Sequence, residues 1–143
     1  MQVKANRLKN ETIWITGGSS GIGYALVEKL AVHNKVIVSA RSQSKLAEMA
    51  QKFPNVSVVV FDVSDKTQIG RVSNELSQIT HHIDRAILNA GNCEYLDIEQ
   101  PDWDIMERMM AVNFLGMVNS LQACLPLLRN AQHPHLIGVS SQA

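Results

Sequence analysis

The chain contains few cysteine, proline and aromatic residues. Its 143 residues include two cysteines, four prolines and only 5% aromatic side chains. Cys93 and Cys124 stand singly, without the spacing of a metal site or a disulfide framework, so we expect reduced thiols. Apolar residues make up 45% and charged residues 18% of the sequence, which excludes a disordered or fibrous chain. A chain of this length is predicted to form one globular domain over residues 1–143.

An excess of charge of either sign is also absent. Thirteen Lys and Arg residues balance thirteen Asp and Glu residues, and no basic stripe follows a predicted helix, so nucleic acid is not expected as a partner. The longest apolar runs, such as Val56 to Phe61, are shorter than a membrane span, and residues 1–6 lack the apolar core of a signal peptide. We therefore expect no membrane partner and a cytoplasmic location. The five histidines have no metal-ligand spacing, so no metal site is predicted.

The chain does contain a regular alternation of strand and helix patterns. Short β-branched or apolar runs predict strands at 12–16, 36–39, 56–62, 86–89 and 136–140. Apolar residues at helical spacing predict helices at about 20–32, 46–53, 69–79 and 103–129. Ser42 or Ser44 is expected to cap the second helix, and the pattern Asp65-x-x-Gln68 predicts a capping box for the third.

This order of elements predicts an α/β fold. Strict β-α-β-α alternation with nearly continuous apolar strands is typical of a doubly wound parallel sheet with helices on both faces. The chain is expected to reverse direction after the third strand, so the first and fourth strands become neighbours and a ligand crevice opens at their carboxyl ends. The residues at the carboxyl ends of the five strands are Thr16–Gly18, Arg41, Asp62, Asn89–Gly91 and Ser140–Ser141.

A glycine-rich turn follows the first predicted strand. Gly17, Gly21 and Gly23 have the spacing Gly-x-x-x-Gly-x-Gly between a strand and a helix. Glycine permits the tight turn and the approach of a pyrophosphate to the backbone, while the helix N-terminus offers free N–H groups and a positive dipole end. The pattern favours a dinucleotide site, and an ordinary glycine-rich turn is the alternative.

The segment 16–23 resembles the Thr-Gly-x-x-x-Gly-x-Gly signature of the short-chain dehydrogenase/reductase family, and further motifs follow in order along the chain. Residues 88–91 resemble the family's Asn-Asn-Ala-Gly element, with Leu88 in place of the first Asn. The resemblance implies an NAD(P)-binding Rossmann fold with a catalytic Asn and a catalytic Ser. It implies catalytic roles for Asn113 and Ser141 and cofactor-binding roles for Gly17, Ser19, Ser20, Gly21, Ile22, Gly23, Arg41, Asp62, Val63, Asn89, Ala90 and Gly91.

Several of these residues also have simpler interpretations. Asp62 resembles the family's adenine-contacting Asp, but it could instead cap the turn before the next helix. Asn113 could be a buried amide that its surroundings satisfy, since an Asn inside a helix needs a reason. Ser140 and Ser141 could be ordinary turn residues at a strand end, although the family register favours Ser141.

The residue after the second predicted strand bears on the choice of cofactor. An acidic side chain about twenty residues past the glycines would bind the ribose 2′-OH and repel a 2′-phosphate. This place holds Arg41, whose charged fork suits phosphate, and Ser19 could add a hydroxyl. NADP(H) is therefore favoured over NAD(H). The alternative is a solvated surface Arg, because the glycine-rich loop has no second basic residue.

The family's Tyr-x-x-x-Lys pair does not occur in the sequence. Tyr24 and Tyr95 are the only tyrosines, and neither has Lys four positions on. The resemblance places the pair about a dozen residues past Ser141. We therefore expect a truncated chain that does not turn over by itself.

The predicted function of the parent protein is NAD(P)(H)-dependent interconversion of a carbonyl and an alcohol by hydride transfer on a small-molecule substrate. The resemblance implies that Ser141 hydrogen-bonds the substrate oxygen and that Asn113 holds a water of the proton relay. The alternative is a non-catalytic dinucleotide-binding regulatory or scaffolding protein, which would not need both residues. The resemblance also implies a homo-oligomer, a dimer or tetramer, formed through the helix near 103–129.

Overall fold

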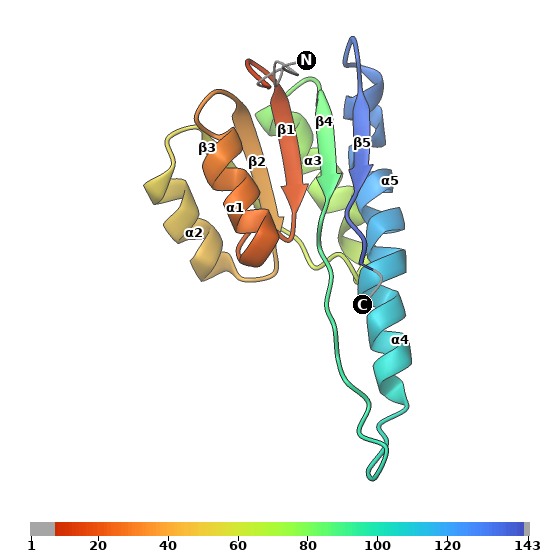
Figure 1. Ribbon diagram of the computed structural model, residues 1–143. Coiled ribbons are helices and arrows are strands. Elements are labelled where there is room, and N and C mark those ends of the chain that lie inside the picture. The colour runs from red at the N-terminus through yellow and green to blue at the C-terminus, as the bar shows by residue number, and fades with distance from the viewer. Residues whose placement is uncertain (1–7, 142–143) are drawn as a thin grey trace, which may run out of the picture.

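Five parallel strands form the central sheet of the molecule (Figure 1). The computed structural model describes residues 8–141. The strands are β1 (Thr12–Thr16), β2 (Lys35–Ala40), β3 (Val56–Val60), β4 (Arg85–Leu88) and β5 (His135–Gly138). Their order in the sheet is β3-β2-β1-β4-β5, and all neighbouring pairs are parallel. The predicted doubly wound α/β fold is confirmed, and β1 and β4 are adjacent as expected.

Helices cover both faces of the sheet (Figure 1). One face carries α1 (Gly21–Leu30) and α2 (Gln43–Lys52). The other carries α3 (Ile69–Ile79), which the short 3₁₀ turn η1 (Lys66–Gln68) precedes, and a long helical stretch made of α4 (Asp104–Met110), η2 (Ala111–Leu115) and α5 (Gly116–Arg129). In a sheet of this topology, the loops at the carboxyl ends of the strands form the ligand crevice.

The sheet has one apolar core on each face, because successive strand residues point to opposite sides. Ile15 packs with Val27 of α1 on one face, and Trp14 packs with Leu76 of α3 on the other. All four side chains are completely buried. The indole N–H of Trp14 donates to Ser39 Oγ at 3.0 Å, so its polar atom is satisfied inside the core. Burial on both faces explains why the strands are continuous apolar runs in the sequence.

The predicted capping box at the third helix is wrong in part. Asp65 accepts a hydrogen bond from the Thr67 N–H at 3.0 Å and so caps η1. The Gln68 side chain does not reach back to the Asp65 N–H; its oxygen accepts from the Asp62 N–H at 3.2 Å. At the second helix, Ser42 is the N-cap. The predicted strand 12–16 has the bounds of β1, and the boundaries of the other predicted elements differ from the observed ones by at most three residues.

The helix predicted near 103–129 is helical from Asp104 to Arg129, but a π turn, η2, interrupts it. Such turns insert an extra residue and are frequent at functional sites. By length and composition alone this 26-residue stretch could cross a membrane. In the structure its buried face, which includes Cys124 and Leu127, belongs to the core formed with α3 and the sheet. Burial raises the pKa of the Cys124 thiol to about 12.

Candidate cofactor site

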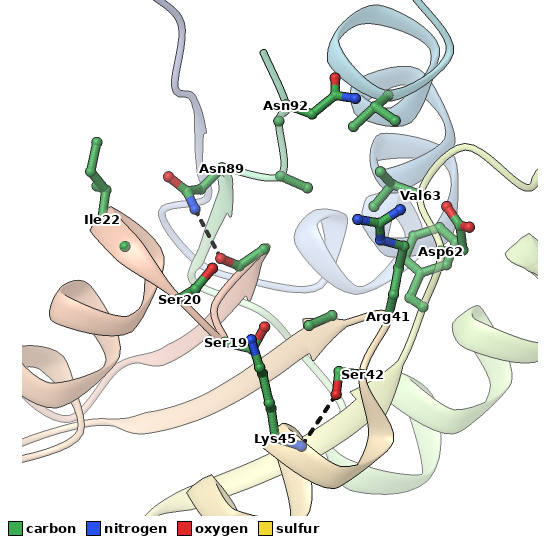
Figure 2. A pocket seen from close by; sticks show the side chains of 17 residues that line it. Ser19, Ser20, Ile22, Arg41, Ser42, Lys45, Asp62, Val63, Asn89 and Asn92 are labelled. Carbon is green, nitrogen blue, oxygen red and sulfur yellow. Dashed lines mark hydrogen bonds between the residues drawn. The ribbon is translucent and has the colours of Figure 1, made fainter. Parts of the chain in front are cut away.

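A pocket of about 600 Å³ opens at the carboxyl ends of β1 to β4 (Figure 2). Eleven of the twelve predicted cofactor-binding residues line it, and the exception is Gly23. These residues are Gly17, Ser19, Ser20, Gly21, Ile22, Arg41, Asp62, Val63, Asn89, Ala90 and Gly91. The remaining lining residues are Ala40, Ser42, Lys45, Phe61, Asn92 and Val112. The fold thus brings together five segments that are far apart in the sequence.

The glycine-rich turn has a backbone that other residues would not tolerate. Gly17 has a φ of +65°, and a Cβ at this position would lie 2.7 Å from the Ala90 Cα. Gly21 also has a positive φ, +53°. Gly23 lies behind the pocket, where a Cβ would come 2.3 Å from the Gly17 carbonyl oxygen and 2.6 Å from Asn89 Nδ2. The first glycines therefore shape the turn, and the last lets α1 pack closely on the sheet.

The N-terminus of α1 is open to the pocket. Ser20 occupies the N-cap position but its side chain makes no capping hydrogen bond, and the first turn of α1 contains no acidic residue. Ser19, Ser20, Gly21 and Ile22 all line the pocket. The free N–H groups and the positive end of the helix dipole are therefore available to an anion.

Hydrogen bonds join the glycine-rich turn to the segment after β4. Thr16 Oγ1 accepts from the backbone N–H groups of Asn89, at 3.1 Å, and Ala90, at 3.2 Å. Asn89 Nδ2 in turn donates to the Gly17 carbonyl at 3.2 Å (Figure 2). Asn89 therefore has a structural contact of its own. These bonds hold the glycine-rich turn and the segment after β4 at a defined separation.

Two basic side chains line the pocket next to the end of β2. Arg41 follows β2 directly, and Lys45 lies in the first turn of α2. Figure 2 shows Lys45 extending toward Ser19 and Arg41 extending toward Asp62. Within residues 8–141, neither cation forms a salt bridge. Two unpaired positive charges in one pocket favour an anionic ligand.

Lys45 is not among the site residues predicted from the sequence, because it lies outside the glycine-rich loop. The signal that points to it is its spacing. Lys45 follows Arg41 by four residues, and the predicted cap at Ser42 places it in the first turn of a helix. A basic residue there lies near the carboxyl end of the preceding strand.

The turn after β3 contains Asp62, which both caps the turn and lines the pocket. Asp62 Oδ1 accepts from the Ser64 N–H at 3.0 Å and from the Ser64 hydroxyl at 2.7 Å, so Asp62 does cap its own turn. Asp62 and Val63 also line the pocket. The capping contact fixes the shape of the turn, and the turn forms one wall of the pocket.

The two predicted catalytic residues lie outside the pocket lining. Asn113 belongs to η2, and its amide binds the backbone of Asn92 twice: Oδ1 accepts from the N–H at 2.8 Å, and Nδ2 donates to the carbonyl at 2.9 Å. Asn113 is therefore a satisfied amide that holds the segment after β4. Ser141 follows β5 and is exposed.

Comparisons with known proteins agree with this geometry. The short chain dehydrogenase family model matches residues 11–143. An uncharacterised oxidoreductase of Staphylococcus saprophyticus is 29% identical over 140 residues, which cover 94% of this chain and 60% of the relative. A short chain dehydrogenase from Salmonella enterica serovar Typhi has a TM-score of 0.87 and 26% identity, over 99% of this chain and 62% of the other. A Pseudomonas aeruginosa protein solved as an NADP active-site complex has a TM-score of 0.86 and 25% identity, over 94% of this chain and 56% of the other.

The chain belongs to the short-chain dehydrogenase family. At the level of the family this is a class of NAD(P)-dependent oxidoreductases. The chain spans about 60% of the length of the curated relative from Staphylococcus saprophyticus.

Proposed function

We propose that the pocket binds NADP(H) and that the protein transfers hydride between this cofactor and a small-molecule carbonyl or alcohol. The observation that carries the proposal is the pairing of two anion sites in one pocket. The open N-terminus of α1 is the first, and the unpaired Arg41 and Lys45 are the second. A dinucleotide with both a diphosphate and a 2′-phosphate supplies anions for both.

Each part of the cofactor has a set of residues that fits it. The diphosphate fits the turn from Gly17 to Gly23, where added Cβ atoms would fill the space or strain the backbone. The 2′-phosphate fits Arg41 and Lys45, with hydroxyls from Ser19 and Ser42 nearby in the same lining. The adenine is assigned to the wall formed by Asp62 and Val63.

The nicotinamide is assigned to the opposite wall, which consists of the residues after β4. Asn89, Ala90 and Gly91 line the pocket there. Asn92 Oδ1 lies at this end as a buried acceptor that has no hydrogen-bond partner among the described residues. An unpaired buried acceptor favours a ligand that carries a donor, as the carboxamide of nicotinamide does.

The bound cofactor would supply or accept the hydride. We assign Ser141 to a hydrogen bond with the substrate oxygen and Asn113, through its helix backbone, to a water of the proton relay, as the family resemblance implies. The 143 residues contain no Tyr-x-x-x-Lys pair. We therefore expect these residues alone to bind cofactor without turnover.

Calorimetric titration of NADPH and NADH tests the cofactor assignment. The unaltered protein should bind NADPH more tightly than NADH. Arg41→Ala and Lys45→Ala should each weaken NADPH binding by about tenfold, roughly 1.4 kcal/mol, and leave NADH binding nearly unchanged. Lys29→Ala is the matched control, because Lys29 lies in the last turn of α1, away from the pocket. Tighter binding of NADH than of NADPH would contradict the proposal.

Two further expectations belong to the same proposal. The absence of a Tyr-x-x-x-Lys pair about a dozen residues past Ser141 in the natural reading frame would favour the regulatory or scaffolding alternative. We also propose a homo-oligomer formed through the helix near 103–129, because Met106, Met110, Phe114 and Val118 are exposed along it. A monomer in light scattering at high concentration would contradict the oligomer.

A further inference from the structure

Two residues of α5 are unfavourable in a helix, and the helix itself does not explain them. Gly116 begins α5, and Asn119 lies three residues later, on the same side. Glycine and asparagine both have low helix propensity. Asn119 is also only 8% exposed, so its amide has lost most of its contact with water. A contact outside the helix must compensate for the low helix propensity of both residues and for the burial of the Asn119 amide.

That contact is Val63, in the turn that lines the pocket. Asn119 Nδ2 donates a buried hydrogen bond to the Val63 carbonyl at 2.8 Å. A Cβ at Gly116 would lie 2.7 Å from Val63 Cγ2 and 3.2 Å from Val63 Cβ, so the glycine leaves the space that this side chain occupies. One residue of α5 makes room for Val63 and the other binds it.

From Asp62 onward the remaining hydrogen bonds of this turn are local, while the preceding Phe61 N–H donates to the Ala40 carbonyl at 3.0 Å. Within the described residues, Asp62 is bound by Ser64 and Gln68, which lie two and six positions away. Asn119 lies 56 positions from Val63. Local bonds give the turn its shape, the bond from Phe61 ties its start to the end of β2, and the bond from Asn119 ties Val63 to the long helical stretch (Figure 2 shows Val63 beside Asp62).

The same helical stretch holds the opposite wall of the pocket. Asn113 makes its two hydrogen bonds with the backbone of Asn92, which lines the pocket after β4. The amides of Asn113 and Asn119 therefore connect one helical stretch to both walls. Removing one amide should release one wall and leave the other in place.

We propose that Asn119, with Gly116 making room for Val63, is a positioning residue of the adenine subsite. The inference rests on the proposed function, in which adenine lies against Asp62 and Val63. Without the amide, the Val63 carbonyl is buried with no donor, and the turn must move to satisfy it. The adenine half of the cofactor then loses its wall, while the nicotinamide half keeps the wall held by Asn113.

Binding of cofactor halves to Asn119→Ala tests this inference. Calorimetry would compare NADPH, adenosine 2′,5′-bisphosphate and reduced nicotinamide mononucleotide on the unaltered protein and the variant. We expect NADPH and the bisphosphate to bind about tenfold more weakly to Asn119→Ala, and the mononucleotide to change by less than about twofold. A purely structural role would lower the melting temperature without favouring one half over the other.

Two other variants make the test decisive. Gly116→Ala pushes on Val63 while keeping the amide, so it should weaken the adenine half selectively, and it decides the question if Asn119→Ala does not fold. Ser120→Ala is the matched control: Ser120 is 1% exposed, but its hydroxyl donates to the Gly116 carbonyl within the helix, at 2.7 Å. It should lower the melting temperature and leave both halves unchanged.

The outcomes separate this inference from the proposed function. If the unaltered protein binds neither NADPH nor NADH, the proposed function fails and the inference fails with it. If the unaltered protein binds NADPH but Asn119→Ala and Gly116→Ala bind the bisphosphate equally well, only the inference is overturned. An equal loss in both halves, or the same loss in Ser120→Ala, would also overturn it.

Discussion

The two halves of the pocket are built in different ways. The half from β1 to β3 consists of short elements joined by short turns, and every residue of β1 is buried. The other half follows β4, where residues 89–103 contain no helix or strand and extend beyond the sheet (Figure 1). In that segment, Tyr95 is 89% and Ile98 is 87% exposed.

This difference indicates where the stability of the molecule lies. The first half packs against two apolar cores, to which β4 and α5 also contribute, and its glycine-rich turn is shaped by its own residues. Residues 89–103 are held through a few polar contacts, chiefly the bonds of Asn113 to Asn92 and of Thr16 to the segment after β4. Regions with few buried apolar contacts open at lower free energy than a packed core. Damage to the packed cores should therefore unfold the protein, and damage to residues 89–103 should act locally.

The largest effect is expected from Gly23→Val. The added side chain would meet the Gly17 carbonyl oxygen, 2.3 Å from the Cβ position, and backbone at this place cannot move without separating α1 from the sheet. We expect the free energy of unfolding to fall by about 3 kcal/mol or more, with loss of cofactor binding. Urea denaturation measures the change.

Gly70→Ala is the control for this substitution. A Cβ at Gly70, in α3, would meet no atom within 4 Å, so alanine should stabilise the protein by up to about 1 kcal/mol through helix propensity. A Gly23→Val protein as stable as the unaltered one would show that α1 does not need its close packing on the sheet.

An intermediate effect is expected when the same truncation is made on opposite faces of the long helix. Leu127 is 5% exposed, so Leu127→Ala should lower the free energy of unfolding by about 2–5 kcal/mol. Met110 is 56% exposed, and Met110→Ala should change it by less than about 0.5 kcal/mol at low protein concentration. Urea denaturation of both variants tests the comparison. A loss at Met110 that grows with protein concentration would instead show that a second copy covers this face.

The smallest effect is expected from the ion pairs of the segment after β4. Arg108 Nη2 lies 2.7 Å from Glu94 Oε2 and 2.8 Å from Asp102 Oδ2, and the hydrogen bonds from Arg108 lower the pKa of both carboxyls. Carboxyls with a lowered pKa stabilise the folded state above their ordinary values, about 4, and this contribution is lost as pH falls through the lowered values. The loss is small because the groups are exposed.

Arg108→Met should remove this pH dependence. The difference in melting temperature between the unaltered protein and the variant should be constant from pH 7 to about pH 5.5 and shrink toward zero below about pH 4. Arg129→Met is the control, since Arg129 forms no salt bridge with the described residues. A difference that persists at pH 3 would mean that Arg108 acts through packing instead of charge.

Much of the first half could be predicted from the sequence because its signals are local. The run from Thr12 to Thr16 predicted β1 to the residue, and the spacing of the three glycines predicted the turn at the pocket. Both depend on residues a few positions apart. The capping-box prediction failed at Gln68, because its side-chain oxygen accepts from the Asp62 N–H and its amide donates to Asp65 Oδ2, so it does not bind the Asp65 N–H.

The second half was harder to predict from the sequence, because its contacts join residues that are far apart in the chain. The apolar period of residues 103–129 predicted a helix, but the π turn at Ala111–Leu115 has no periodic signature. Asn113 was expected near catalysis, and its structural partner, Asn92, could not be inferred from helix spacing. Asn119 attracted no prediction, because nothing near it in the sequence indicates Val63.

The sequence by itself determined the class of fold, the glycine-rich turn and the segments that meet at the pocket, because apolar period and short motifs act over a few residues. Only the tertiary structure decided that Lys45 joins Arg41 in one pocket and that two asparagines of one helical stretch hold opposite walls. Such contacts depend on how a helix is rotated and seated against the sheet. That position results from packing over the whole core, and no local pattern records it.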